Sequence, residues 1–142
     1  MDRTPTVEAL SYADCLDTLA AATTGRVALV VDGVPEVIPA NYIVDGDMVV
    51  FRSANDTLLA HAGMAKVAFE VDHIDDASRT GSSVVVHGYL YDITDTMDAT
   101  SERLRRIPLE TWAPDPRDRW FEIRPYGMTG RRVRGVPPAP TA

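Results

Sequence analysis

The histidines and the cysteine are the residues of this chain with the widest range of possible chemistry. His61, His73 and His87 fall on three separate predicted elements, and no other candidate ligand pairs with them at metal-ligand spacing. A metal site is therefore not expected. Cys15 lies on the apolar side of a predicted helix, with no histidine near it in sequence to activate it, so we interpret it as a core residue.

Other common enzyme signatures are also absent from the sequence. No serine or cysteine occupies a nucleophile elbow. The glycines that could form a phosphate-binding loop lie instead on separate predicted turns, at Gly33, Gly46 and Gly63. His87, Arg117 and Arg119 are candidate substrate contacts, although the simpler interpretation of each is an ordinary surface residue. No catalytic residue is predicted.

Charge and composition narrow the possible partners. The 142 residues carry a formal net charge of −7, which disfavours a nucleic-acid partner because phosphate backbones bind to basic faces. Arg131, Arg132 and Arg134 form a small basic cluster, which we interpret as a solvated strand end. A single cysteine cannot form an internal disulfide, which fits a reducing compartment. No apolar run is as long as a membrane span, which needs about 20 residues, and the N-terminus lacks the apolar core of a signal peptide. These features predict a cytoplasmic protein with no membrane partner.

A helix and a three-stranded meander are predicted for the first part of the chain. Ser11 and Asp14 form a carboxylate variant of the capping box at the start of a helix over residues 12–22. Three β-rich runs follow, separated by Asp-Gly pairs typical of hairpins, at 27–31, 37–44 and 48–51. Pro39 lacks the N–H that a central strand needs, so we expect its strand to be bulged or at a sheet edge there.

The rest of the chain alternates between β-rich runs and turns. We predict a helical turn at 58–61, a strand at 66–72 and a long strand, bent at Gly88, at 82–94. A polar surface helix should follow at 95–107, and then one or two terminal strands at 120–125 and 128–134. The domain should span residues 11–134, between an N-terminal arm of residues 1–10 and a disordered proline-rich tail of residues 135–142. This order favours a mainly β fold, a closed antiparallel barrel with peripheral helices.

Five segments, taken in order, resemble a known family. They are VIPANYIVDGDMVVFRSANDTLLAHA, KVAFEVD, RTGSSVVVHGYLYDITD, WAPDPRDRWFEIRP and TGRRV, and they span most of residues 10–134. Their order and separation are similar to those of the pyridoxamine 5'-phosphate oxidase-like FMN-binding split barrels, in particular the small actinobacterial-type members. The resemblance implies a split barrel of antiparallel Greek-key type.

The same resemblance implies a cofactor site. The isoalloxazine ring of FMN would lie against the backbone of Ile38, Pro39, Ala40 and Asn41. Arg52, Ser53 and Thr57 would bind the phosphate. Ser82 and Ser83 would contact the flavin, and Trp112 would shield the ring from the other subunit of a homodimer. The alternatives for single residues are an edge proline at Pro39 beside a solvated Asn41, an ion pair of Arg52 with Asp56 or Glu70, and a core or interface role for Trp112.

Two positions depart from the family pattern, because relatives often carry lysine where Leu58 stands and tryptophan where Ser82 stands. The function that the resemblance implies is an FMN-dependent oxidoreductase, transferring electrons from a reduced donor to a small organic acceptor at the interface of a homodimer. A deazaflavin-dependent reductase is one alternative. A non-catalytic flavin- or small-ligand-binding protein is the other, and the two departures favour it.

Overall fold

One antiparallel sheet forms the body of the protein in the computed structural model, which describes residues 4–54, 56, 58, 63, 65–112 and 119–140. Its strands are β1 (Thr6–Ala9), β2 (Thr24–Val31), β3 (Val34–Asp45), β4 (Met48–Ser53), β5 (Ala65–Asp75), β6 (Thr80–Asp92) and β7 (Arg119–Arg134). They follow the order β1-β7-β4-β3-β2-β5-β6, and β7 also pairs with β6. This extra pairing closes the sheet into a barrel and confirms the predicted fold class.

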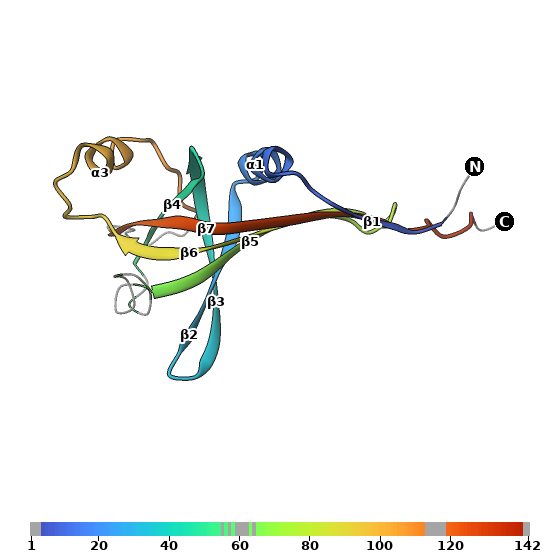
Figure 1. The fold of residues 1–142 in the computed structure, drawn as a ribbon, viewed down its shortest axis with the longest axis horizontal. Coiled ribbons are helices and arrows are strands. Elements are labelled where there is room, and N and C mark those ends of the chain that lie inside the picture. The colour runs from blue at the N-terminus through green and yellow to red at the C-terminus, as the bar shows by residue number, and fades with distance from the viewer. Residues whose placement is uncertain are drawn as a thin grey trace.

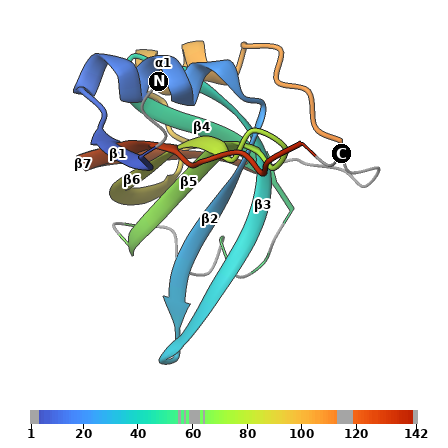
Figure 2. The ribbon, with the colours of Figure 1, turned by 90° about the vertical axis from the view of Figure 1, so that its right-hand side faces the viewer.

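The connections follow a Greek-key pattern. β2, β3 and β4 form the predicted meander, and β5 returns to lie beside β2 instead of beside β4. The Asp-Gly turns of the meander place Gly33 at φ 78° and Gly46 at φ 64°, the left-handed region in which glycine has no steric penalty. Figure 2 shows the β2–β3 hairpin projecting well below the barrel.

The far ends of β5, β6 and β7 leave the barrel as an extension. In Figure 1 this extension runs toward the side where the two chain termini lie. β1 joins it by pairing Thr6 with Arg134 and Ala9 with Arg131, so part of the predicted N-terminal arm is a strand. The ladder between β6 and β7 shifts register between His87 and Gly88, where the sequence predicted a bend.

Two apolar clusters support the barrel. The main core contains the fully buried rings of Phe51, Phe69 and Phe121, and the rings of Phe51 and Phe121 stack with centroids 5.4 Å apart. A smaller cluster of Val50, Ile93 and Leu104 lies on the outer side of β4. Strand alternation explains the division, because neighbouring residues of β4 point to opposite faces.

Helix α1 (Tyr12–Ala21) begins as predicted, since the Oγ atom of Ser11 accepts a hydrogen bond from the Asp14 amide at 3.1 Å. Cys15 and Leu19 on its inner side are buried, which agrees with a core role for the cysteine. None of the described helices is long and apolar enough to cross a membrane.

Helix α3 (Ala99–Leu104) is shorter than the helix predicted over 95–107. Asp98 is its N-cap and accepts the amide hydrogen of Ser101 at 2.8 Å, which sets a later start than the apolar pattern suggested. Met97 falls within the predicted helix, but it precedes the observed one and its side chain is 89% exposed. Leu104 and Ile107 do pack in the smaller cluster.

Candidate functional site

Strands β3 and β4 separate at one end of the barrel and leave an open strand edge. Their pairing runs from Asp45 and Met48 as far as Tyr42 and Phe51. Beyond that point, Asn41 and the residues before it continue to pair with β2, where Pro39 lies opposite Arg26. Pro39 thus lies at an edge, as predicted. The backbone of Ile38 to Asn41 borders this edge on the side away from β2.

Asn41 is held in place by hydrogen bonds to two other segments. Its Nδ2 atom donates to the Thr24 hydroxyl at 3.0 Å and to the Thr23 carbonyl at 3.4 Å. Its Oδ1 atom accepts from the backbone N–H of Trp112 at 2.8 Å. The Trp112 side chain is 67% exposed, so in a single copy of the chain it is not a core residue.

Arg52 lies near the end of β4, just beyond the last β3–β4 pair, and borders a pocket. Its Nη1 atom donates to the Leu109 carbonyl at 3.5 Å, and its guanidinium carbon lies 5.3 Å from the centroid of the Trp120 ring. Glu70, one of the two predicted ion-pair partners of Arg52, pairs with Arg26 at 2.9 Å. The pocket has a volume of about 620 Å³ and is lined by Arg52, Arg105, Ile107, Pro108, Leu109, Glu110 and Trp120.

Segment 105–112 covers this part of the sheet, because it contacts Asn41 through Trp112 and Arg52 through Leu109. The Leu109 side chain is buried and anchors the segment. α3, which precedes the segment, is tied to the barrel by the Arg103 guanidinium, whose two bonds to the Asp45 carboxylate measure 2.8 and 3.0 Å. That pairing lowers the pKa of Asp45 and raises the pKa of Arg103.

A second ion pair joins the ends of β6 and β7 next to the pocket. Arg119, at the start of β7, binds the Asp92 carboxylate. Burial of Asp92 tends to raise its pKa, but hydrogen bonds from Thr94 and the Arg119 guanidinium outweigh burial and lower it below the ordinary value of 3.8. The backbone N–H of Trp120, the residue after Arg119, donates a hydrogen bond to the Thr94 hydroxyl at 2.8 Å.

Three more residues that the sequence analysis discussed are Ser53, Leu58 and Thr57. Ser53 is 6% exposed, and strand alternation places its side chain on the opposite face of β4 from Arg52. Leu58 is fully buried in the main core. Thr57 lies outside the described residues.

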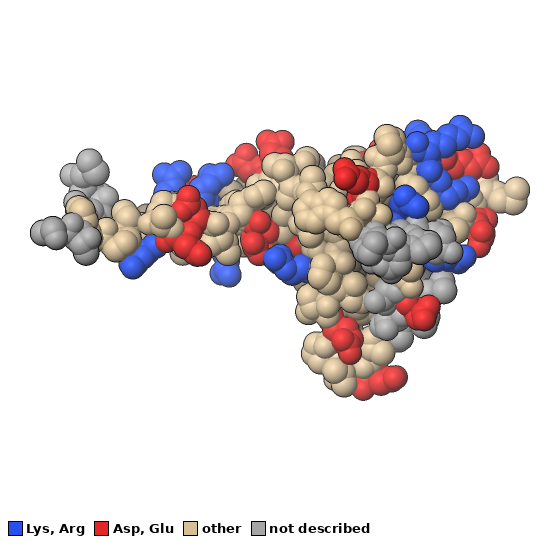
Figure 3. All heavy atoms as spheres, turned by 180° about the vertical axis from the view of Figure 1, so that it is seen from behind, with Lys and Arg blue, Asp and Glu red and all other residues tan. Residues whose placement is uncertain are grey.

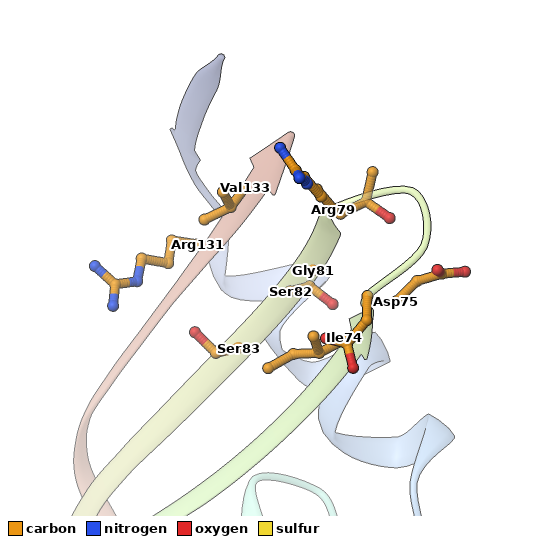
Figure 4. Close-up of a pocket in the computed structure, with 10 residues that line it drawn as sticks. Ile74, Asp75, Arg79, Gly81, Ser82, Ser83, Arg131 and Val133 are labelled. Atoms are coloured by element: carbon orange, nitrogen blue, oxygen red, sulfur yellow. The ribbon is translucent and has the colours of Figure 1, made fainter. Parts of the chain in front are cut away.

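Ser82 and Ser83 lie on β6 in the extension. Together with Ile74, Asp75, Asp76, Arg79, Thr80, Gly81, Arg131 and Val133 they line a groove of about 420 Å³. The register places Gly81 between Ile74 of β5 and Val133 of β7, so a residue without a side chain forms the floor between two exposed apolar ones. Figure 4 shows Arg131 and Asp75 pointing to opposite sides of this groove.

The predicted site residues thus form two groups within one chain. Arg52 pairs with Trp120 and Ser83 pairs with Arg131, and roughly 35 Å of extended β7 separates these two positions. Ile38, Pro39, Ala40, Asn41, Arg52 and Trp112 lie at the barrel end, and Ser82 and Ser83 lie in the extension. Figure 3 shows basic side chains in blue and acidic side chains in red at both places, near α3 and along the extension.

Residues that the sequence interpretation missed complete the barrel end. Arg105, Leu109 and Trp120 line the pocket with Arg52. They come from a helix end, a proline-rich link and the start of a strand, and nothing in the local sequence indicates that these segments meet.

The three candidate substrate contacts have different positions. His87 lies near Tyr126, with ring centroids 6.3 Å apart, and Arg119 forms the ion pair with Asp92. Arg117 lies outside the described residues. Within the described ranges, no three histidine, cysteine or carboxylate side chains form a candidate metal site.

Comparison with protein families gives a match over most of the chain. A family model described as pyridoxamine 5'-phosphate oxidase matches residues 11–132. An uncharacterised protein of Mycobacterium tuberculosis is 31% identical, over 81% of this chain and 78% of the relative.

Solved structures share the architecture. The FAD-binding protein from Mycobacterium smegmatis is 30% identical with a TM-score of 0.73, over 89% of this chain and 97% of the other. A Corynebacterium glutamicum protein named as a pyridoxamine 5'-phosphate oxidase is 26% identical with a TM-score of 0.78, over 95% of this chain and 97% of the other. The predicted split-barrel architecture is therefore confirmed by both the topology and the neighbours.

Proposed function

Because this chain belongs to the pyridoxamine 5'-phosphate oxidase family, we propose that it binds a flavin nucleotide at the open edge of β3 and acts as a flavin-dependent oxidoreductase. One observation carries the proposal: the open β3 edge, Asn41 and the Arg52 pocket adjoin at the point where β3 and β4 separate. The name of the Mycobacterium smegmatis neighbour, a FAD-binding protein, supports a flavin as the ligand.

The described residues fit such a ligand. A flavin ring has a hydrogen-bonding pyrimidine edge, which suits the backbone groups of Ile38 to Asn41 along the open strand edge. Its side chain ends in a phosphate, which suits a guanidinium, because charged bidentate hydrogen bonds are among the strongest in proteins. Arg52 is half-buried and stacked beside Trp120, so little conformational freedom is lost when it binds an anion.

Bound flavin would supply the electron or hydride transfer, and the protein would supply orientation and phosphate binding. Asn41, fixed by Thr24 and Trp112, would keep the β3 edge in one conformation. Segment 105–112 would limit water on one side of the site. A reduced donor and a small organic acceptor complete the proposed reaction, and no residue is assigned to proton transfer.

A homodimer is part of this proposal. Ser82 and Ser83 lie on β6 and pair with Arg132 and Arg131 of β7, too far along the sheet to reach the Arg52 pocket of their own chain. If they contact the flavin, a second copy must supply them. Light scattering should therefore give twice the mass of one chain, and a monomer at working concentration would remove Ser82 and Ser83 from the site.

A titration of the flavin-free protein with FMN and FAD, followed by the visible spectrum and flavin fluorescence, tests the function. Saturable binding, followed by anaerobic reduction with a nicotinamide nucleotide, is the expected result. A protein that binds neither flavin would refute the proposal. Binding without reduction by that donor would instead favour a deazaflavin donor or a non-catalytic carrier.

A further inference from the structure

The segment of residues 103–112, which we call the strap, is attached to strand β3 near both of its ends. The Arg103 guanidinium donates to the two carboxylate oxygens of Asp45, at 2.8 and 3.0 Å. The Trp112 backbone N–H donates to the Oδ1 atom of Asn41 at 2.8 Å. Asp45 and Asn41 are four residues apart on one strand. The strap therefore follows β3 from its turn end to the open edge proposed as the flavin site.

Strand alternation explains why these attachments lie on one face of β3. Asn41, Ile43 and Asp45 alternate with residues such as the buried Tyr42, so their side chains share the outer face of the strand. Ile43 packs against the smaller apolar cluster, which contains Leu104 of the strap. An ion pair, an apolar contact and a hydrogen bond thus hold the strap along β3, in that order.

The strap is longer than the stretch of β3 that it follows. Four residues of a strand span roughly 13 Å, whereas the nine residue steps of the strap would reach roughly 30 Å if extended. The excess length reaches across to β4, where Leu109 is buried and its carbonyl accepts from Arg52 at 3.5 Å. The pocket of about 620 Å³ is lined both by strap residues and by Arg52 and Trp120 of the sheet. The strap therefore forms one wall of this pocket.

The two ends of the strap are held differently. The bond between Trp112 and Asn41 joins two uncharged groups. The pair of Arg103 and Asp45 is charged and bidentate, and such pairs are stronger and more specific in geometry. Leu104, the next residue, is fully buried and adds apolar packing at the same end. The end at α3 is therefore the more firmly held one, and the position of the whole strap depends on it.

We propose that Asp45 and Arg103 are positioning residues, which hold the strap against β3 and thereby set the rates at which the flavin nucleotide enters and leaves its site. The inference rests on the proposed flavin function. Asn41 and Arg52 would lie against the flavin, whereas Asp45 and Arg103 would act only through the strap. Without the ion pair the strap should open more often. Entry and exit should then both become faster, while the affinity changes little.

Asp45→Asn tests this role, and Asp32→Asn is its matched control. Both aspartates precede the glycine of an Asp-Gly turn, but Asp32 lies in the β2–β3 turn, at the tip of the projecting hairpin. In stopped-flow fluorescence with FMN and with FAD, Asp45→Asn should raise the association and dissociation rate constants by roughly twofold to fivefold each, the range for a partly exposed ion pair. Asp32→Asn should change neither rate constant. Asp45→Glu keeps the charge and should remain close to the wild type.

The pattern of rate constants separates a positioning role from a damaged site. Loss of a direct flavin contact would raise the dissociation rate constant alone and lower the affinity in proportion. That pattern in Asp45→Asn, or rate constants equal to those of the wild type, would overturn the inference.

Proteolysis of the flavin-free protein tests the strap without a ligand. Trypsin cleaves after arginine, and Asp45→Asn leaves Arg105 and Arg106 of the strap unchanged. Cleavage after these two residues, followed by mass spectrometry, should be roughly twofold to fivefold faster in Asp45→Asn than in the wild type, because it depends on the population of the open form. In about 1 M NaCl the ratio of the two rates should fall toward one, since salt screens the ion pair of the wild type. Taking the ratio cancels the effect of salt on trypsin itself.

The two experiments distinguish failure of the inference from failure of the flavin function. If neither FMN nor FAD binds while Asp45→Asn still speeds cleavage, the flavin function fails and the positioning of the strap stands. If the flavins bind with unchanged rate constants and cleavage is equally fast in both proteins, the inference fails and the flavin function stands.

Discussion

The barrel end and the strand extension contain the two groups of predicted site residues, and they are built differently. At the barrel end, β3, β4 and segment 105–112 converge, so Asn41 and Arg52 are each fixed by contacts with other segments. In the extension, Ser83 lies on a sheet whose apolar neighbour Ile74 is 69% exposed. The difference is that the barrel end brings three segments of one chain together, whereas the extension leaves the residues of its strands exposed.

Removing a core ring should have the largest effect and should separate the two regions by stability. Phe51→Ala deletes a fully buried ring stacked on Phe121, and we expect the free energy of unfolding to fall by about 3–5 kcal/mol. Val133→Ala in the extension, where the side chain is 37% exposed, should cost less than about 1 kcal/mol. Guanidinium denaturation measures both. Similar losses would mean that the extension belongs to the same packed core.

Arg52→Ala tests the barrel end by ligand binding. Loss of one charged hydrogen-bonding group should weaken flavin binding by about 1.5–3 kcal/mol, or roughly tenfold to a hundredfold. Arg52→Lys should lie between the wild type and alanine, because lysine keeps the charge without the planar fork. Fluorescence titration measures the affinities. An unchanged affinity in Arg52→Ala would remove Arg52 from the site.

Lowering the pH should show how much the ion pair between Arg119 and Asp92 contributes to stability. The pKa of Asp92 is lowered in the folded protein, so its contribution to stability is present above its ordinary pKa of about 4 and is lost as the pH falls through the lowered value. Asp92→Asn should reduce the dependence of the melting temperature on pH below about 4. The asparagine amide has one acceptor oxygen where the carboxylate has two, so the variant also loses the hydrogen bond from either Arg119 or the Thr94 amide, and its melting temperature at neutral pH should be lower than that of the wild type. An identical acid profile in the variant and the wild type would contradict the assignment.

Ser83→Ala should have the smallest effect. A neutral hydrogen bond contributes about 0.5–1.5 kcal/mol, so flavin affinity should fall by roughly twofold to tenfold. The effect should appear only in the dimer, since the Ser83 that contacts a flavin would come from the second copy. Titrations above and below the dimer dissociation constant distinguish the two states. A loss of the same size in the monomer would place Ser83 and Arg52 in one chain's site, against the register of β7 with β4 and β6.

Local signals in the sequence were enough to predict most of the fold. The Asp-Gly turns, the Ser11 cap and the bend at Gly88 all depend on nearby residues, and all are present in the structure. Periodicity alone could not predict where α3 begins, because the Asp98 cap and the contacts of Leu104 with the barrel determine its length. The closure of the barrel by β7 is likewise a long-range pairing that no local pattern records.

The site was predicted less completely than the fold. Family resemblance named Asn41 and Arg52, which are the first residues beyond the last β3–β4 pair, Tyr42 with Phe51. It gave no reason to include Arg105 or Trp120, because Arg105 reaches the pocket through the fold of segment 105–112 and Trp120 through the long-range pairing of β7 with β4. Ser53 differs from Arg52, since strand alternation places the side chains of these two adjacent residues on opposite faces of β4.

The prolines of β3 bear on how a protein can keep a strand edge open without aggregating. An uncovered edge can pair with the edge of any other chain, which is a common start of fibril growth. Pro35 and Pro39 both lie in the part of β3 that extends past its pairing with β4, and both remain in register with β2. Their missing N–H groups must then fall on the open side. Another strand that paired with this edge would lack two N–H donors of a regular ladder. A small ring that needs only one or two hydrogen bonds would still have partners there.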